Sequence, residues 1–233
     1  MKVSIHQPNF LPWAGFFSKM SKSEKFVILD TVKCSKNSYL NRNRFSASKN
    51  LEESFWLSIP LRKESYRKDI KDVFCIDSRN LEKHIKYFKN RHGKTCEKKF
   101  LEDILGVYEK YLKMQNNRFN ISQFNIEMIK LISKHLEINT EIVLASNLSF
   151  EKNLKKQDLV IDILKNADCS TYVSGLGARE YQEDQDFLNN DIEIVYNNID
   201  FDKSYLVGNH HVSIVDLMLR EGIWKIRKEM ILA

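Results

Sequence analysis

Residues 2–30 read KVSIHQPNFLPWAGFFSKMSKSEKFVILD and contain one βαβ unit of an α/β fold. KVSI is short and rich in β-branched residues, which indicates a strand. Apolar residues at helical spacing in WAGFFSKMSKS indicate a short helix, and the apolar run FVILD indicates a second buried strand. A strand, a helix and a strand within about 30 residues are typical of parallel sheets. The stretch therefore predicts that the two strands share one sheet.

Strands and helices also alternate in the last third of the chain, whereas the middle of the chain is mainly helical. Apolar residues at positions i, i+3 and i+4 predict three helices within residues 79–138. Further strands are expected over 55–61, 72–77, 140–146, 170–175 and 192–197, and further helices over 155–167, within 177–190 and over 212–222. Residues 33–48 are polar and basic and favour a loop. Strands that alternate with helices indicate parallel pairing.

We therefore expect an α/β protein with a mostly parallel sheet of Rossmann-like or nucleotidylyltransferase-like outline. Residues 1–78 would form an N-terminal α/β part and residues 139–233 a C-terminal part that completes the same sheet. Residues 79–138 would be a helical insertion between them. The sequence leaves open whether these helices form a lid, the interface of a homodimer or a separate subdomain.

Composition narrows the classes of function. The net charge of +6 is explained either by solubility or by an anionic ligand, and a small phosphorylated ligand is favoured because no nucleic-acid motif is present. No apolar run approaches the roughly 18 residues that cross a bilayer, and the first residues lack a signal peptide, so we expect a cytoplasmic protein. The four cysteines form no C-x-x-C pair, which predicts reduced thiols and no metal site.

Polar side chains follow the first expected strand. The cluster comprises His6, Gln7, Asn9 and Trp13, with Pro8 and Pro12 between them. In α/β folds, ligands bind beyond the carboxyl ends of the strands, and proline stiffens a loop because it fixes φ. His6 is therefore a candidate general base, although a lone histidine is more often structural. Gln7, Asn9 and Trp13 are candidate substrate ligands.

A second cluster begins at the end of FVILD. Asp30 follows that strand, and a basic run comes next; the candidate ligands in it are Lys33, Asn37, Asn41, Arg42 and Arg44. Arginine and lysine suit a phosphate. Asp30 is a candidate catalytic residue that would bind a hydroxyl, a metal or an amine. The alternatives are a solvated loop and an aspartate that caps a turn.

A third cluster, SGLGAREYQ, follows the expected strand 170–175. Its candidate ligands are Ser174, Gly175, Gly177, Arg179 and Tyr181. Glycines there permit close approach of a ligand to the backbone, although turns need glycine too. A fourth cluster, Gly208–His211 with Asp216, favours core packing or a surface turn. The motifs of P-loop NTPases, Rossmann dehydrogenases, α/β-hydrolases and zincins are absent.

Taken together, six segments resemble the WbqC-like family, which is named from a bacterial O-antigen gene cluster. They are IHQPNFLPWAGFFSKM, FVILDTV, NSYLNRNR, WLSIP, YVSGLGAREY and SIVDLMLREG. They span essentially the whole chain, and the H-Q-P-x-x-x-P-W opening is the most specific part. The resemblance implies a cytoplasmic role in surface-polysaccharide or nucleotide-sugar metabolism. It brings no assigned reaction and no set of catalytic residues.

The resemblance and the clusters favour a transferase that adds an acyl or aminoacyl group to a nucleotide-linked amino sugar. His6 would take the amine proton, Asp30 would orient it or bind a sugar hydroxyl, and the basic run would hold the diphosphate of a UDP-, dTDP- or GDP-sugar. The loop 174–179 would stabilise the oxyanion or hold a donor phosphate. No cofactor is expected beyond an activated acyl or aminoacyl donor.

Two alternatives remain at this stage. The outline also resembles nucleotidylyltransferases with an H-x-G-H motif, which use Mg²⁺ and a nucleoside triphosphate. The corresponding stretch here is F-L-P-W, which lacks both histidines and weakens this alternative. The other alternative is a non-catalytic protein that binds a sugar nucleotide or a partner enzyme. A nucleic-acid partner is disfavoured, and no membrane partner is expected.

Overall fold

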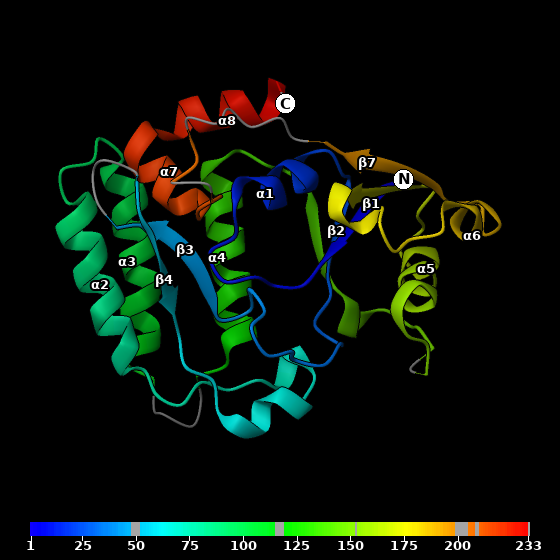
Figure 1. Ribbon diagram of the computed structural model, residues 1–233, viewed down its shortest axis with the longest axis horizontal. Helices are drawn as coiled ribbons and strands as arrows, with labels where there is room; N and C mark the ends of the chain where they lie inside the picture. Colours follow the sequence, from blue (N-terminus) through cyan, green and yellow to red (C-terminus); the bar gives the residue numbers. More distant parts are fainter. Residues whose placement is uncertain (48–51, 115–118, 152, 199–204, 208–209, 233) are drawn as a thin grey trace.

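The main sheet has five parallel strands, ordered β5–β2–β1–β6–β7 (Figure 1). The structure is a computed structural model that describes residues 1–47, 52–114, 119–151, 153–198, 205–207 and 210–232. The strands are β1 (Lys2–His6), β2 (Lys25–Ile28), β5 (Glu141–Leu144), β6 (Thr171–Gly175) and β7 (Glu193–Asn197). These strands overlap the segments predicted from the sequence, with β1 and β2 each reaching one residue beyond them, and the expected α/β fold with a mostly parallel sheet is confirmed.

The strand order creates a switch point beside β1. From β1 the chain passes through α1 (Ala14–Ser21) to β2 on one side. It returns from β5 through α5 (Lys156–Asn166) to β6 on the other side of β1, and then passes through α6 (Asp184–Leu188) to β7. Counting only these strands, the order is 3-2-1-4-5, as in doubly wound sheets. In such sheets the crevice beyond the carboxyl ends of the two central strands receives ligands.

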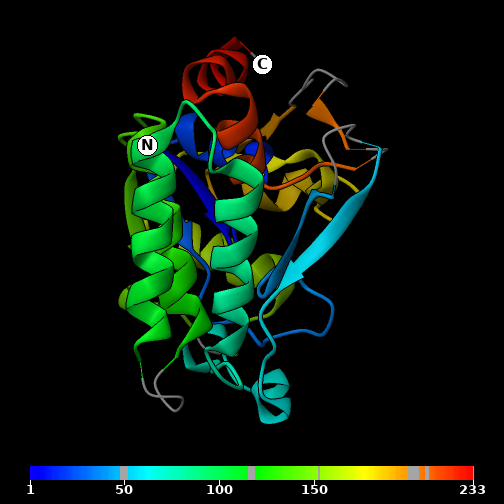
Figure 2. The same cartoon turned by 90° about the vertical axis from the view of Figure 1, so that its left-hand side faces the viewer.

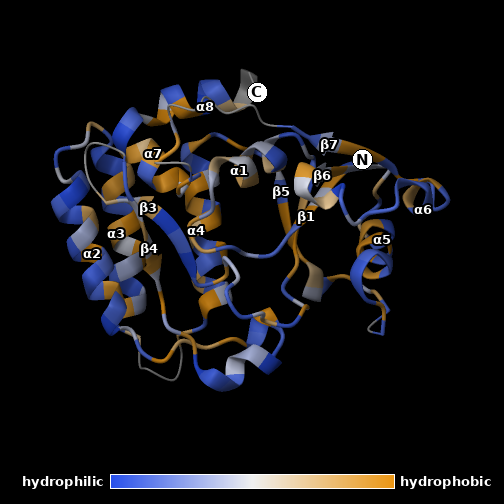
Figure 3. Cartoon of the chain, in the orientation of Figure 1, coloured by the Kyte–Doolittle hydropathy of each residue, from blue (hydrophilic) through white to orange (hydrophobic). Residues whose placement is uncertain are grey.

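Each face of the sheet has its own core, because successive side chains of a strand point to opposite faces. Phe26 and Ile28 pack in the larger core together with α1. Val3, Ile5 and Val27 pack in the smaller core with α5 and α6. Figure 3 shows the apolar strands between the helices. His6 alternates with Ile5, so its side chain lies on the α1 side of the sheet.

A long insertion connects β2 to β5. It contains an antiparallel hairpin of β3 (Arg42–Ser46) and β4 (Ser54–Ser58), followed by α2 (Arg79–His92), α3 (Lys98–Leu112) and α4 (Ile121–His135). The three predicted helices are present, and Figure 2 shows them side by side with the hairpin at their flank. The boundaries predicted for the three parts of the chain stay a prediction.

Three local predictions were wrong. Residues 42–46 of the supposed basic loop form β3, because their backbone pairs with Ser54–Ser58. Residues 72–77 form no strand, because they make only isolated bridges, Leu61 with Cys75 and Phe74 with Asn120. The predicted helix over 212–222 is not the last one, because Gly222 (φ 92°) ends α7 (Ile214–Glu221) and α8 (Ile223–Leu232) follows. Within the described ranges, no helix is long and apolar enough to cross a membrane.

Candidate functional site

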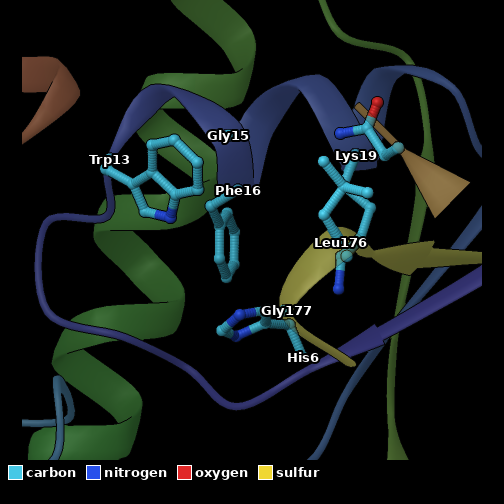
Figure 4. A pocket seen from close by; sticks show the side chains of 9 residues that line it. His6, Trp13, Gly15, Phe16, Lys19, Leu176 and Gly177 are labelled. Carbon is cyan, nitrogen blue, oxygen red and sulfur yellow. The ribbon is translucent and has the colours of Figure 1, made fainter. Parts of the chain in front are cut away.

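A pocket of about 190 Å³ lies at the switch point of the sheet. His6 at the end of β1, Gly175 at the end of β6 and Asn197 at the end of β7 line it, together with residues of α1. The full lining is His6, Trp13, Gly15, Phe16, Lys19, Gly175, Leu176, Gly177 and Asn197. Figure 4 shows seven of these residues around one hollow. The structure thus brings together four predicted site residues, His6, Trp13, Gly175 and Gly177.

Two buried asparagines hold the loop that carries His6 and Trp13. Asn125 of α4 donates from Nδ2 to the carbonyl oxygens of Pro8 and Leu40, each at 2.7 Å. Asn43 of β3 donates to the carbonyl oxygen of Leu11 at 2.7 Å. Leu11 has a φ of 40°, an unfavourable conformation for leucine that these contacts maintain. The proline loop is therefore fixed from both the hairpin and the helical insertion.

His6 is a neutral imidazole in this pocket. Burial lowers the pKa of His6 to about 3, and the positive charge of Lys19 contributes to the decrease. The Nδ1 atom lies 3.0 Å from the carbonyl oxygen of Gln7, which can only accept, so Nδ1 carries the hydrogen. The ring meets Phe16 edge-on at 4.9 Å between centroids. His6 therefore keeps Nε2 as a hydrogen-bond acceptor at neutral pH.

Lys19 is a charged site residue that the sequence did not predict. Its side chain is only 5% exposed, and Nζ donates to the carbonyl oxygen of Ile5 at 2.8 Å. Burial lowers the pKa of Lys19 to about 7. Gly15 and Lys19 are four residues apart and thus lie on one face of α1, a spacing that would have indicated a shared surface. At neutral pH the lysine exchanges readily between its charged and uncharged forms.

Trp13 forms one wall of the pocket and depends on Gly15. A Cβ atom on Gly15 would lie 2.2 Å from two ring carbons of Trp13, so the indole packs directly over the glycine. The other neighbour of the indole is His211, with 4.7 Å between ring centroids. Of the predicted Gly208–His211 cluster, Gly208 and Asn209 lie outside the described residues. His211 therefore supports the pocket wall.

We expect Gly15→Ala to displace the Trp13 indole and to destabilise the fold by about 1–2 kcal/mol, because overpacking outweighs the better helix propensity of alanine. The indole N–H signals of the three tryptophans report the displacement by NMR, with Trp13→Phe to assign the signal. Gly106→Ala is the matched control, because a Cβ there meets nothing within 4 Å. That variant should keep all indole signals in place. An unshifted Trp13 signal in Gly15→Ala would contradict the packing.

The glycine loop leaves space on the opposite side of the pocket. A Cβ atom on Gly175 or Gly177 would meet nothing within 4 Å, so both glycines leave room without being required by packing. Ser174 points elsewhere, since it is buried and its hydroxyl donates to Oε1 of Gln182 at 2.9 Å. The Arg179 guanidinium lies 5.7 Å from the ring of Tyr196 and does not line the pocket.

Three other predicted residues, Gln7, Asn9 and Asp30, do not line the pocket. Gln7 and Asn9 are partly buried in the proline loop, where the Asn9 N–H donates to the Gln7 carbonyl oxygen at 2.8 Å. Asp30 is buried, and its two oxygens accept from the N–H and the hydroxyl of Ser146, at 2.9 and 2.7 Å. These bonds tie the end of β2 to the segment after β5. The catalytic role of Asp30 stays a prediction, and its contacts favour a structural one.

The basic run forms a surface on the outer face of the hairpin. The guanidinium carbons of Arg42 and Arg44 lie 4.4 and 4.6 Å from the ring centre of Trp56, and Tyr39 packs at 5.8 Å from the same ring. Within the described residues, neither arginine forms an ion pair with a carboxylate. Figure 3 shows the hydrophilic β3 strand. Two cations beside an aromatic ring suit a phosphate and a flat ring.

Three more predicted residues have structural contacts. Asn41 donates from Nδ2 to the carbonyl oxygen of Ile59 at 2.8 Å, and the carbonyl oxygen of Asn37 accepts from Arg42 at 2.9 Å. Lys33 is exposed and pairs with Asp69 at 2.8 Å. An exposed pair of this kind contributes little to stability, roughly 0–1 kcal/mol. Lys33 therefore remains accessible to a ligand.

A larger pocket of about 450 Å³ lies on the α5 side of the sheet and includes the predicted residue Tyr181. Its walls are mainly aliphatic, with Leu29, Val32, Leu159 and Val160. Lys156 is the one lysine, arginine, aspartate or glutamate in its lining. The smaller pocket is the better candidate for a reaction, because it combines the switch point with two basic groups of lowered pKa.

No group of three His, Cys, Asp or Glu side chains in the described ranges is arranged to hold a metal ion. The other lining residues that the sequence did not predict are Gly15, Phe16, Leu176 and Asn197. Asn197 lies beside Gly175 because β7 pairs with β6, a long-range contact that the sequence pattern does not reveal. Its buried Oδ1 has no hydrogen-bond partner among the described residues.

Comparisons with known proteins agree with the expected family. A protein of Mycobacterium tuberculosis that is described only as uncharacterized is 26% identical over 226 residues, which cover 95% of this chain and 94% of that protein. No solved structure matches the chain. The profile of the WbqC-like protein family matches residues 7–228, nearly the whole chain. The chain therefore belongs to the WbqC-like protein family.

Proposed function

We propose that this protein is a transferase that adds an acyl or aminoacyl group to a nucleotide-linked amino sugar in surface-polysaccharide biosynthesis. The observation that carries the proposal is the pairing of neutral His6 with Lys19 in one pocket at the switch point. Acyl transfer to an amine needs a group that accepts the amine proton and a positive charge near the carbonyl oxygen. The family resemblance supports the pathway.

The proposed step uses the lone pair of His6. The amine nitrogen attacks the carbonyl carbon of the activated donor, so a carbon–nitrogen bond forms and the bond from that carbon to the leaving group breaks. His6 accepts the amine proton at Nε2. Because its pKa is low, it returns the proton readily to the departing group, which leaves with the bonding electrons. Protonated Lys19 would balance the negative charge that develops on the carbonyl oxygen.

The outer face of the hairpin is the proposed binding surface for the nucleotide part of the substrate. Arg42 and Arg44 are held beside Trp56 without a carboxylate partner among the described residues. Arginine binds phosphate oxygens by a planar fork, and an aromatic ring stacks on a nucleobase. We assign the diphosphate and base of the sugar nucleotide to this surface. The sugar would extend from it toward the switch-point pocket.

The first test is a calorimetric titration of the protein with a panel of UDP-, dTDP- and GDP-linked amino sugars, followed by mass spectrometry with acyl donors. With a productive pair, we expect His6→Ala to lower kcat by about 100-fold, the lower range for a general base. His210→Ala is the matched control, because His210 is exposed and does not line the pocket. Saturable binding without transfer by any donor would favour a binding protein. Absence of binding across the panel would overturn the proposal.

A further inference from the structure

Lys19 is a buried cation without an acidic partner. Within the described residues, no carboxylate lies within 4.0 Å of its Nζ atom, and its hydrogen-bond partner is the Ile5 carbonyl oxygen. An ammonium group in such a place loses its hydration without gaining a counter-ion, which costs several kcal/mol. Its other close neighbour is the ring of Phe26, 6.0 Å from Nζ. An apolar side chain such as methionine would therefore give a more stable fold at this position than lysine does.

The pocket around Lys19 offers positive and polar groups and no negative charge. Its remaining titratable lining residue is His6, contributed by β1. On the side of β6, Gly175 and Gly177 leave open space, and β7 contributes the Asn197 side chain, which carries no charge. The volume of about 190 Å³ suits a small group rather than a whole nucleotide. The ligand that this environment lacks is therefore a compact anion.

We infer that the switch-point pocket binds the compact anionic end of a ligand, a phosphate or a carboxylate, with protonated Lys19 as its counter-ion. The inference rests on the proposed function only for the identity of the pocket, and it requires no group transfer. Under the proposed reaction, the anion is an acidic group of the acyl donor beside its reacting carbonyl, so that the Lys19 ammonium faces both, while the sugar diphosphate binds at Arg42 and Arg44.

Proton uptake follows from this arrangement. In the free protein burial lowers the pKa of Lys19 to about 7, so above neutral pH most molecules carry an uncharged amine. A bound anion favours the charged form and raises the pKa. His6 also faces the anion, but its pKa of about 3 keeps it neutral at pH 6 and above. Above pH 7 the pocket must therefore take up a proton as the anion binds.

The test is an NMR pH titration of the lysine side chains, labelled with ¹³C at Cε, with Lys19→Met to assign the Lys19 signal. We expect saturating phosphate or acetate to raise the titration midpoint of Lys19 by about one pH unit or more relative to chloride at equal ionic strength. Phosphate and acetate are separate arms that identify the type of anion. Lys22, exposed at the end of the same helix, is the internal control and should not respond.

Two results would overturn the inference. One is an unchanged Lys19 midpoint with both anions, and the other is equal phosphate affinity of wild type and Lys19→Met. The Lys19→Arg variant carries a permanent positive charge at this position. If it still binds phosphate but takes up no proton, the result supports the role of the charge. The amino-sugar panel tests the proposed function separately. Failure of either experiment therefore leaves the other claim intact.

Discussion

Replacement of Lys19 by methionine is expected to stabilise the fold by about 3 kcal/mol at pH 6. Burial lowers the pKa of Lys19 from 10.5 to about 7, which at about 1.4 kcal/mol per pKa unit corresponds to about 5 kcal/mol of lost stability when the lysine is charged. Methionine fills a similar volume but cannot donate to the Ile5 carbonyl oxygen, which offsets about 1–2 kcal/mol.

The pH dependence of the stability gain distinguishes removal of the buried Lys19 charge from a simple change in packing. Between pH 7 and pH 10.5 the unfolded chain binds a proton at Lys19 that the folded protein does not, so wild-type stability rises with pH across this window. Lys19→Met lacks this contribution. The advantage of the variant should therefore be full below pH 7 and should disappear as the pH approaches 10.5.

Urea unfolding at several pH values, monitored by circular dichroism, measures the difference. Lys22→Met is the matched control, because Lys22 lies at the end of the same helix but is exposed, and it should change stability by less than about 0.5 kcal/mol. A Lys19→Met variant less stable than wild type at pH 6 would contradict the unpaired charge. If Lys19→Met is more stable than wild type but no longer binds the anion, Lys19 serves function at the expense of stability.

Much of the site followed from the positions of residues at strand ends. His6 ends β1 and Gly175 ends β6, and both strands were evident from short apolar runs with β-branched residues. The carboxyl ends of parallel strands lie at one edge of a sheet, so the sequence was enough to group His6, Trp13 and the glycine loop. The strand order, which makes this edge a switch point, depends on long-range pairing and was not predictable.

The sequence did not predict Lys19 as a site residue, because the pattern that indicates this helix consists of its apolar residues alone. Within AGFFSKM the lysine resembles an ordinary solvent-facing residue, and only the packing of α1 on both the sheet and α8 buries it. Its spacing from Gly15 gave a usable signal. Asn197 gave none, because its place beside Gly175 results from the pairing of β6 and β7.

The basic run shows how a polar residue can conceal a strand. Arg42 and Arg44 alternate with Asn43 and Phe45, which is the period of a half-buried strand. The polar and basic composition of residues 33–48 nevertheless favoured a loop, and Asn43 is the polar residue at an inward position. Its amide is buried because it donates to the carbonyl oxygens of Phe10 and Leu11. A partner more than 30 residues away thus satisfies a group that local sequence cannot explain.

Asp216 is the residue whose loss should damage the fold most. It is fully buried on α7 and accepts hydrogen bonds from Ser46 of β3 at 2.9 Å and from Tyr87 of α2 at 3.3 Å. His92 Nε2 lies 3.4 Å from one oxygen, and Arg220 Nη1 lies 3.6 Å from the other. Burial alone would raise the pKa of this carboxyl, but the contacts with His92 and Arg220 hold it below its usual range.

Asp216→Ala is expected to destabilise the protein by about 3–5 kcal/mol, because it leaves buried His92 without its carboxylate and removes one of the two carboxylates that pair with Arg220. Asp216→Asn keeps an acceptor for Ser46 and should cost less. Since the folded pKa lies below the unfolded value, the contribution is present above about pH 4 and is lost as the pH falls through the folded pKa. The difference between wild type and Asp216→Ala should therefore shrink in acid.

Chemical unfolding of both variants at pH 7 and pH 3 tests this prediction, with Asp103→Ala as the control. Asp103 is a partly exposed aspartate that pairs with Lys99 and His135, so its loss should cost about 1 kcal/mol or less. Equal losses for the two aspartates would contradict the buried network. The start of α7 also contacts the loop that carries Trp13, because the Ile214 N–H donates to the Pro12 carbonyl oxygen at 2.9 Å. Even the folded fraction of Asp216→Ala should therefore show a shifted Trp13 indole signal, since the Asp216 network holds the helix against which the proline loop is fixed.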